Sequence, residues 1–479
     1  MADELQAAAL LEQRGLRSDA ERRYRELLDH RPDWAVARFN YACFLRRGGR
    51  LEEALAEHRR ALELGIDQPE EVHSNIGVIC NELRRDADAR ASFEQALALD
   101  PEYIPALYNL ALLREEFGER EAALGMFHAI LELNPAYHDA LVRIAYAKRI
   151  TDPADPVVRK LRRQLRRSHV DELARESLHF ALGKALDDCG LHDEAFLQYE
   201  AGNRLGAKRL LPYDRAAEEA RIGQIIETFT AARLATLAPV SERPLLFITG
   251  MFRSGSTLFE QLLAAHPEIT AGGEIDYFGR ELAGAGRAFP DSIAALDAAG
   301  WQRLGSGYLD YLDRTFPGGG IVTNKRPDAF EWLGLLKSMY PNARFVNTVR
   351  HPLDTCLSIY FQQLDGRIGY ACDLANIGHR HRQYQRLMQH WSGQFGASIF
   401  DADYDAFVAD PRPVAQNLLR FLGLPWHEDC LGFQRLRTRV RTASIWQVRD
   451  SVYASSSGRW RNYERQLEPA RRQLGQPSA

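Results

Sequence analysis

The N-terminal part of the chain repeats with a period of about 34 residues. The turns that close successive units are separated by 34, 35 and 34 residues, at Pro32, Ile66, Pro101 and Pro135. Twelve positions before each turn is a small residue, at Ala20, Ala54, Ala89 and Ala123. Eight positions before each turn is a ring-bearing residue, at Tyr24, His58, Phe93 and Phe127. A fixed period of this length predicts helical hairpins that bury their apolar faces against one another.

This pattern resembles the tetratricopeptide repeat, a helix-turn-helix unit that stacks into a superhelix. The repeats are expected at about 1–34, 35–68, 70–103 and 104–137, with a degenerate repeat at 176–205, so that the repeat domain covers 1–205. The resemblance implies a concave face that docks peptides or proteins, and an exposed repeat edge would also allow a homodimer. Residues 206–243 are expected to be a helical linker, with one helix over 214–234.

Charge and composition indicate an ordinary globular protein rather than a nucleic-acid or membrane-surface binder. The 479 residues carry a formal net charge of -4, so a bound anion requires a local site. The six cysteines are scattered, which favours free thiols in a reducing compartment. Because the sequence has neither a signal-peptide pattern nor an apolar run of spanning length, we expect a cytoplasmic protein with no membrane span.

The chemistry is concentrated in the C-terminal half, beginning with a predicted strand, loop and helix. Residues 245–249 are apolar and β-prone, 250–257 form a glycine-bearing loop, and 258–266 have a helical pattern that ends before Pro267. This order places backbone N–H groups and a helix N-terminus around a phosphate. Compared with the loop of nucleotide triphosphatases, Ser256 replaces the lysine and Arg253 supplies the cation. We predict no strand that ends in a magnesium-binding aspartate.

A second strand and helix follow the same plan. Residues 343–349 are strand-like and lead into Arg350, and the helix expected at 353–363 contains Ser358. Arg350 therefore lies at the carboxyl edge of a predicted parallel sheet, where open α/β sheets bind their ligands.

Together these two segments resemble the cofactor-binding motifs of the sulfotransferase family. The implied fold is α + α/β: a tetratricopeptide-repeat superhelix, then a P-loop-like α/β sulfotransferase domain with a central parallel sheet over 244–465 and a tail at 466–479. The implied co-substrate is 3′-phosphoadenosine-5′-phosphosulfate, with no metal. Its predicted binding residues are Arg253, Ser254, Gly255, Ser256, Thr257, Arg350, Ser358, Tyr404, Gly458 and Arg459.

Within that family the likeness is to the tyrosylprotein sulfotransferases. It rests on the R-S-G-S-T loop, the Gly273-Glu274 pair, the N-K pair that ends at Lys325, and the S-x-x-Q-V segment that begins at Ser444. The resemblance implies sulfuryl transfer to a hydroxyl acceptor, with a protein tyrosine among the candidates. Those animal enzymes are membrane-anchored and disulfide-bonded, which this sequence does not suggest, so the acceptor stays open between a tyrosine, a carbohydrate and a small phenol.

The predicted mechanism is in-line transfer. Glu274 is the general base, provided that burial raises its pKa, and Arg253 and Lys325 stabilise the developing charge. Ser444 adds a hydrogen bond. Glu274 could instead cap a helix, Lys325 could be a solvated turn residue, and His266 and His351 fit capping and tuning roles better than catalysis. Two other functions stay open: an ATP-dependent transferase, and a non-catalytic adaptor with a degenerate sulfotransferase domain.

Overall fold

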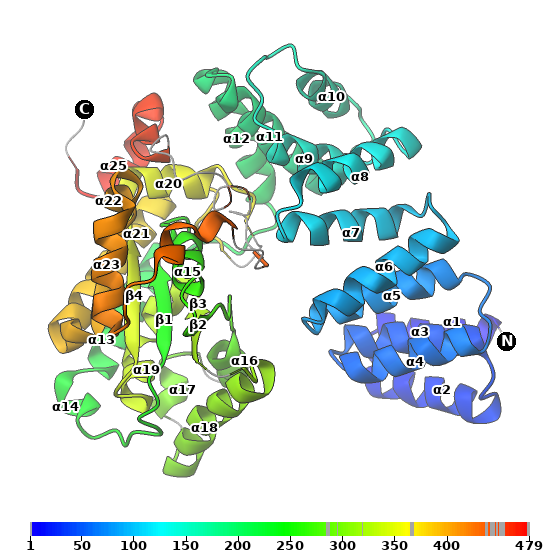
Figure 1. The fold of residues 1–479 in the computed structure, drawn as a ribbon, viewed down its shortest axis with the longest axis horizontal. Helices are drawn as coiled ribbons and strands as arrows, with labels where there is room; N and C mark the ends of the chain where they lie inside the picture. The colour runs from blue at the N-terminus through cyan, green and yellow to red at the C-terminus, as the bar shows by residue number, and fades with distance from the viewer. Residues whose placement is uncertain are drawn as a thin grey trace. The chain divides into compact units, whose positions relative to one another are not determined.

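The chain folds into two compact units, 1–147 and 148–479, each described by itself (Figure 1). The structure is a computed structural model, and it describes residues 2–283, 288–294, 296–318, 320–364, 368–435, 439–440, 446, 449 and 456–476. The predicted repeat domain 1–205 therefore spans the first unit and the first helices of the second.

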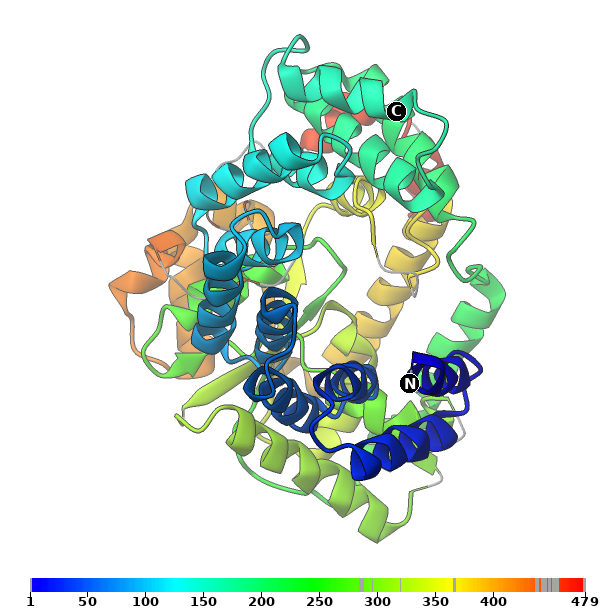
Figure 2. The same cartoon turned by 90° about the vertical axis from the view of Figure 1, so that its right-hand side faces the viewer.

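Unit 1–147 is a row of antiparallel helix pairs, each packed on the next in chain order. Figure 2 shows these helices, dark blue to cyan, following one another along an arc. The helices are α1 (Ala2–Gln13), α2 (Arg17–His30), α3 (Ala35–Arg47), α4 (Leu51–Glu63), α5 (Pro69–Glu82), α6 (Asp86–Leu99), α7 (Ile104–Glu116), α8 (Arg120–Leu133) and α9 (His138–Ala147). The first eight form the four predicted repeats.

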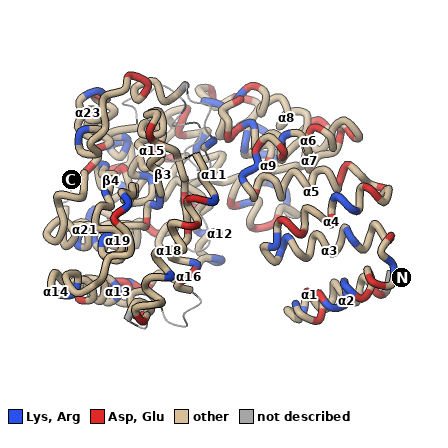
Figure 3. The backbone as a smooth tube through the Cα atoms, turned by 60° about the horizontal axis from the view of Figure 1, so that its bottom comes forward, with Lys and Arg blue, Asp and Glu red and all other residues tan. Residues whose placement is uncertain are grey.

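The small and large positions of the repeat pack as the sequence indicates. Ala20, Ala54, Ala89 and Ala123 are fully buried. A Cβ added at Gly77 would lie 2.5 Å from the ring of Phe93, so this helix contact tolerates only glycine. Figure 3 shows basic and acidic residues interspersed along these helices. Ion pairs join neighbouring repeats, such as Arg47–Glu12 at 2.6 Å and Arg46–Glu82 at 2.8 Å.

The second unit begins with three helices that precede its sheet. They are α10 (Pro156–Leu165), α11 (Glu172–Asp188) and α12 (His192–Gly206). The α11–α12 pair covers the segment predicted to be a degenerate fifth repeat, and its Tyr199 ring stacks on Phe361 with centroids 3.7 Å apart. The buried Asn203 Nδ2 donates to the carbonyl oxygen of Tyr360 at 2.8 Å. This helix pair is therefore part of the core of the second unit.

A five-stranded parallel sheet, in the order β2-β3-β1-β4-β5, forms the centre of this unit. The strands are β1 (Leu246–Gly250), β2 (Ile269–Thr270), β3 (Ile321–Lys325), β4 (Arg344–Val349) and β5 (Ile399–Asp403). Phe247 of β1 pairs with Phe345 of β4, and the loop strand β1 lies between β3 and β4. Parallel pairing brings the carboxyl ends of β1, β3 and β4 to one edge.

Helices cover both faces of the sheet. Leu246 and Ile248 pack in one core with α15 (Ser256–Ala264), α22 (Tyr404–Ala409) and α23 (Pro411–Leu422). The alternate residue Phe247 stacks on Tyr308 of α18 (Ala298–Thr315), and Phe345 packs on Phe395 of α21 (Leu374–Phe395). The remaining α-helices are α13 (Arg215–Thr228), α14 (Ala231–Leu234), α16 (Tyr277–Ala283), α17 (Asp291–Ala294), α19 (Leu333–Met339), α20 (Pro352–Tyr360) and α25 (Glu468–Gln473).

Two local predictions need correction, and a third observation concerns the strand ends. The linker helix expected over 214–234 is two helices, because Thr230 caps a new one at Ala231. Helix α15 begins at Ser256 rather than at 258, because Gly255 ends the loop in a left-handed conformation. Strand β5 does end in an aspartate, Asp403, whose carboxylate accepts from Ala406 N–H and caps α22. The strands that flank β1 end in Lys325 and Val349.

All six cysteines lie in the described residues and carry free thiols. In the described part of the chain, no helix combines the length and the apolar character needed to cross a bilayer. Within the same residues, no group of three or more His, Cys, Asp or Glu side chains is arranged to hold a metal ion.

Candidate active site

The loop between β1 and α15 turns sharply at two glycines that no larger residue could replace. Gly250 has a φ of 144°, and a Cβ there would lie 2.5 Å from Thr348 Oγ1. Gly255 has a φ of 106°, and its Cβ would lie 2.6 Å from the ring of Tyr404. The loop therefore wraps closely in front of the α15 N-terminus, whose first N–H groups have no partner within the helix. A helix start of this kind attracts an anion.

Arg253 lies in the middle of this loop in a left-handed conformation. Its φ is 68°, which costs a non-glycine residue about 1–2 kcal/mol. Two contacts fix it: its Nε–H donates to Ser358 Oγ at 3.0 Å, and its carbonyl oxygen accepts from Arg350 Nη1 at 3.1 Å. The two predicted cofactor motifs are therefore joined directly.

Arg350 directly follows β4, and its guanidinium lies over an aromatic ring. Its guanidinium is 4.8 Å from the centroid of Tyr404, and the Tyr404 hydroxyl bonds Ser456 Oγ at 2.6 Å. Arg350 Nη2 donates to the Ser456 carbonyl oxygen, whereas its Nε is buried and has no hydrogen-bond partner among the described residues. This geometry leaves a donor available for a ligand oxygen.

Glu274 and Lys325 form a close ion pair beside the loop. Their Oε1 and Nζ atoms are 2.5 Å apart, with the Lys325 side chain 1% exposed and the Glu274 side chain 50% exposed. The burial on which the predicted role of Glu274 as a base depends is therefore only partial. The buried carboxylate is Glu260 of α15, which accepts from Gly273 N–H at 3.0 Å and from the Thr323 hydroxyl at 2.8 Å. Burial raises the pKa of Glu260, while Lys325, Thr323 and Gly273 oppose that rise.

A cavity of about 920 Å³ opens in front of the loop. One part, here called the donor end, is lined by Phe252, Arg253, Gly255–Leu258, Arg350 and Tyr404. The other part, the acceptor end, is lined by 211–214, Ala217, Glu218, Arg221, Asp276, Arg326–Asp328, Glu331, Leu364, Ile368–Tyr370 and Arg380. Glu274 also lines this cavity.

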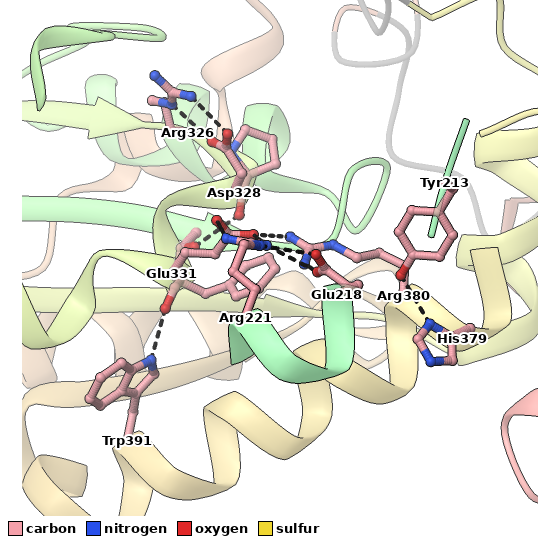
Figure 4. A network of polar contacts seen from close by, with 12 residues as sticks. Tyr213, Glu218, Arg221, Arg326, Asp328, Glu331, His379, Arg380 and Trp391 are labelled. Atoms are coloured by element: carbon pink, nitrogen blue, oxygen red, sulfur yellow. Dashed lines mark hydrogen bonds and ion pairs between the residues drawn. The ribbon is translucent and has the colours of Figure 1, made fainter. Parts of the chain in front are cut away.

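The wall of the acceptor end is a network of ion pairs (Figure 4). Arg221 binds Glu331 at 2.7 Å and Glu218 at 3.0 Å, and Arg380 contacts the same two carboxylates. Burial would raise the pKa of Glu331, but Arg380 and Arg221 lower it to about 2. Glu331 therefore stays charged at neutral pH, and its ion pairs hold the wall together.

Seven of the thirteen predicted site residues line the cavity, and three more lie behind or beside its wall. The lining residues are Arg253, Gly255, Ser256, Thr257, Glu274, Arg350 and Tyr404. The Ser254 hydroxyl is buried, donating to Met251 O at 2.7 Å, and Lys325 and Ser358 contact Glu274 and Arg253 from outside the lining.

Three of the thirteen are not placed at the cavity. Gly458 donates its N–H to Asp354 at 2.7 Å, and Arg459 pairs with Asp187 of α11; neither is among the described lining residues. Ser444 lies outside the described residues.

Sequence reasoning missed the residues of the acceptor wall. Glu218 and Arg221 belong to the predicted linker, where they have the spacing of an ordinary exposed helix. Arg326 and Asp328 could have been predicted as site residues, because they directly follow the carboxyl end of β3, where open α/β sheets bind ligands.

Family models support this reading of both parts of the chain. The sulfotransferase family model matches 244–428, and a tetratricopeptide repeat model matches 83–168. The chain thus carries a tetratricopeptide-repeat region followed by a sulfotransferase-family domain with a parallel sheet, as predicted.

Individual relatives are distant. The chain is 30% identical over 411 residues to an uncharacterized protein of Aquifex aeolicus. The aligned residues make up 82% of this chain and 53% of that protein. It is 25% identical over 223 residues to protein-tyrosine sulfotransferase 1 of Danio rerio, 44% of this chain and 62% of the relative. The chain therefore spans less than two thirds of either relative. Among solved structures, the sulfotransferase domain from the Synechococcus PCC 7002 olefin synthase is 22% identical, with a TM-score of 0.36, over 47% of this chain and 88% of that domain.

Proposed function

We propose that this protein transfers a sulfuryl group from 3′-phosphoadenosine-5′-phosphosulfate to a hydroxyl acceptor by in-line displacement. The observation that carries the proposal is one cavity in which the anion-binding loop, Arg350 and Glu274 all meet. A protein tyrosine is the first candidate acceptor, because the matched relatives include protein-tyrosine sulfotransferases.

The donor end suits a nucleotide that carries two separate anionic groups. The loop N–H groups and Arg253 would hold the 5′-phosphosulfate, and Arg350 with Ser358 would hold the 3′-phosphate. The buried, unpartnered Nε of Arg350 supports this assignment, since such a donor requires an acceptor. When bound, the nucleotide supplies an activated sulfuryl group and a phosphate leaving group.

Glu274 is placed to serve as the general base. Its half-exposed carboxylate lines the cavity, and the buried ammonium of Lys325 holds it in position at 2.5 Å. As the acceptor hydroxyl loses its proton to Glu274, Lys325 and Arg253 stabilise negative charge in the reacting region. Positioning and charge stabilisation thus provide most of the catalysis, as in phosphoryl transfer.

Calorimetric titration with adenosine 3′,5′-bisphosphate tests the donor assignment. The bisphosphate should bind more tightly than ADP, and Arg350→Ala should weaken it by about 1.5–3 kcal/mol, because a charge-assisted hydrogen bond is lost. The matched control is Arg412→Ala, since Arg412 lies outside the cavity lining and pairs with exposed Glu428 at 3.0 Å.

Equal binding of ADP and the bisphosphate, or an effect of Arg412→Ala as large as that of Arg350→Ala, would contradict the assignment. Binding without sulfuryl transfer to any acceptor would favour the adaptor function instead. We further propose that the repeat region docks a peptide or protein partner and that the protein works in the cytoplasm; a homodimer stays a prediction.

A further inference from the structure

The acceptor end of the cavity carries more carboxylates than cations. Three described guanidiniums line it, those of Arg221, Arg326 and Arg380. Six carboxylates line the same part or its junction with the donor end, those of Asp214, Glu218, Glu274, Asp276, Asp328 and Glu331. Even when Lys325 behind Glu274 is counted, the described residues leave a formal excess of two negative charges.

Every one of these guanidiniums is already engaged by two carboxylates. Arg221 and Arg380 share Glu218 and Glu331, as Figure 4 shows. Arg326 binds Asp328 at 2.7 Å and also contacts Asp276. A carboxylate arriving on an acceptor would have to displace one of these buried or half-buried partners, which costs the desolvation and pairing that already exist.

The excess charge is located on residues that an acceptor can reach. Asp276 and Asp328 share one guanidinium, and their side chains are 40% and 31% exposed. Asp214 is exposed, and its carboxylate accepts a hydrogen bond from the neutral Ala217 N–H at 3.0 Å. Among the described residues it forms no ion pair. A positively charged group of the acceptor next to its reacting hydroxyl would therefore be attracted by these carboxylates. A negatively charged group in the same place would be repelled by them.

The same part of the cavity also offers aromatic and apolar surface. Tyr213 and Tyr370 pack edge to face with centroids 5.8 Å apart, and Leu364 and Ile368 line the cavity beside them. This surface fits a ring-bearing hydroxyl, because aromatic pairs gain from such offset contacts.

We infer that the acceptor is a phenolic hydroxyl whose neighbouring groups are basic or neutral, and that acidic flanking groups are selected against. This inference rests on the proposed function. The selectivity is set partly by α13, a helix that lies outside the family-matched residues 244–428. The negative charge of the wall would thus favour acceptors with basic flanking groups by attraction and disfavour those with acidic flanking groups by repulsion.

Three peptides of equal length test the inference, each with one central tyrosine flanked by lysine, glutamine or glutamate. With saturating donor nucleotide, kcat/KM should fall in that order, by about tenfold from the lysine to the glutamate peptide. The difference should shrink in 1 M salt, because exposed charges are then screened. Calorimetric binding of the same peptides to protein loaded with adenosine 3′,5′-bisphosphate should give the same order without turnover.

Shape-conserving variants assign the effect to the wall. Asp276→Asn should reduce the preference for the lysine peptide about threefold or more. Asp214→Asn should act in the same direction, because asparagine still caps α13. Asp429→Asn removes an equal charge from an exposed position outside the lining and should leave the order unchanged.

A preference for the glutamate peptide, or equal rates for all three, would overturn the inference while leaving the proposed function intact. The same holds if Asp429→Asn shifts the preference as much as Asp276→Asn. Failure of the protein to bind the bisphosphate and to transfer sulfuryl groups would overturn both. Nucleotide binding without binding or transfer of any of the peptides would overturn the phenolic acceptor alone.

Discussion

The two ends of the cavity use arginine in opposite ways. At the donor end, Arg350 donates to two carbonyl oxygens, which are neutral, and one of its nitrogens is left for a ligand. At the acceptor end, Arg221 and Arg380 are fully committed to Glu218 and Glu331. The first arrangement keeps positive charge available for binding, whereas the second uses positive charge to hold the wall together.

The largest expected difference between the two ends is in stability, and removing one cation from each end tests it. Arg380→Met leaves Glu218 and Glu331 with one cation between them and should lower the free energy of unfolding by about 3–5 kcal/mol. Arg350→Met breaks hydrogen bonds to neutral acceptors and should cost about 1 kcal/mol. Urea unfolding of both variants measures the difference. Equal losses would show that the two ends do not differ in this respect.

Acid should weaken the acceptor wall before it affects the donor end. The pKa of Glu331 is lowered to about 2 in the folded protein, from an ordinary value of 4.5. A lowered folded-state pKa contributes stability above pH 4.5, and that contribution is lost as the pH falls toward 2. The loss is about 3 kcal/mol at its full extent. Urea midpoints between pH 6 and pH 2 should show it, and Arg380→Met should show a shallower dependence.

Between the two ends, Glu274 should control turnover and not nucleotide binding. Glu274→Gln keeps the size of the side chain but removes the base, so kcat should fall about 100-fold or more. Affinity for adenosine 3′,5′-bisphosphate should hardly change, because Glu274 lies outside the donor end. Glu268→Gln, at an exposed position outside the lining, is the matched control. Retained activity in Glu274→Gln would place the base elsewhere.

The smallest expected effect concerns Glu260, which holds the Gly273–Glu274 segment from behind. Because the pKa of Glu260 is raised in the folded protein, its contribution to stability is present at low pH and is lost as the pH rises through that pKa. Glu260→Gln keeps an oxygen acceptor for Gly273 N–H and cannot ionise. The variant should therefore gain stability relative to the natural protein as the pH is raised from 4 to 8. A pH-independent difference in urea midpoint would argue against it.

The fold was predictable from sequence wherever the signal is local. The 34-residue period fixes the four helix pairs, and the apolar runs at 245–249 and 343–349 became β1 and β4 within one residue. The errors also have local causes that a pattern of apolar residues does not reveal. Gly255 adopts a left-handed conformation and lets α15 start early, and Thr230 caps a helix in the middle of a continuous helical pattern.

The donor end of the candidate site was predictable because each of its motifs directly follows a strand of the same sheet. The acceptor end was not, because its contacts join distant parts of the chain. Arg221 and Glu331 are 110 positions apart, and Arg380 and Glu218 are 162 apart. A single sequence does not reveal which helix closes a pocket built by another part of the chain.

The contacts of α11 and α12 determine where the protein can be divided into fragments. Because Asn203 bonds Tyr360 at the end of α20 and Tyr199 stacks on the next residue, Phe361, a C-terminal fragment cut at 206 or 244 would expose an aromatic surface and invite aggregation. A fragment boundary near residues 147 and 148, where the two compact units meet in the chain, would avoid this exposure. Helices α11 and α12 would then stay with the sulfotransferase-family domain in any such fragment.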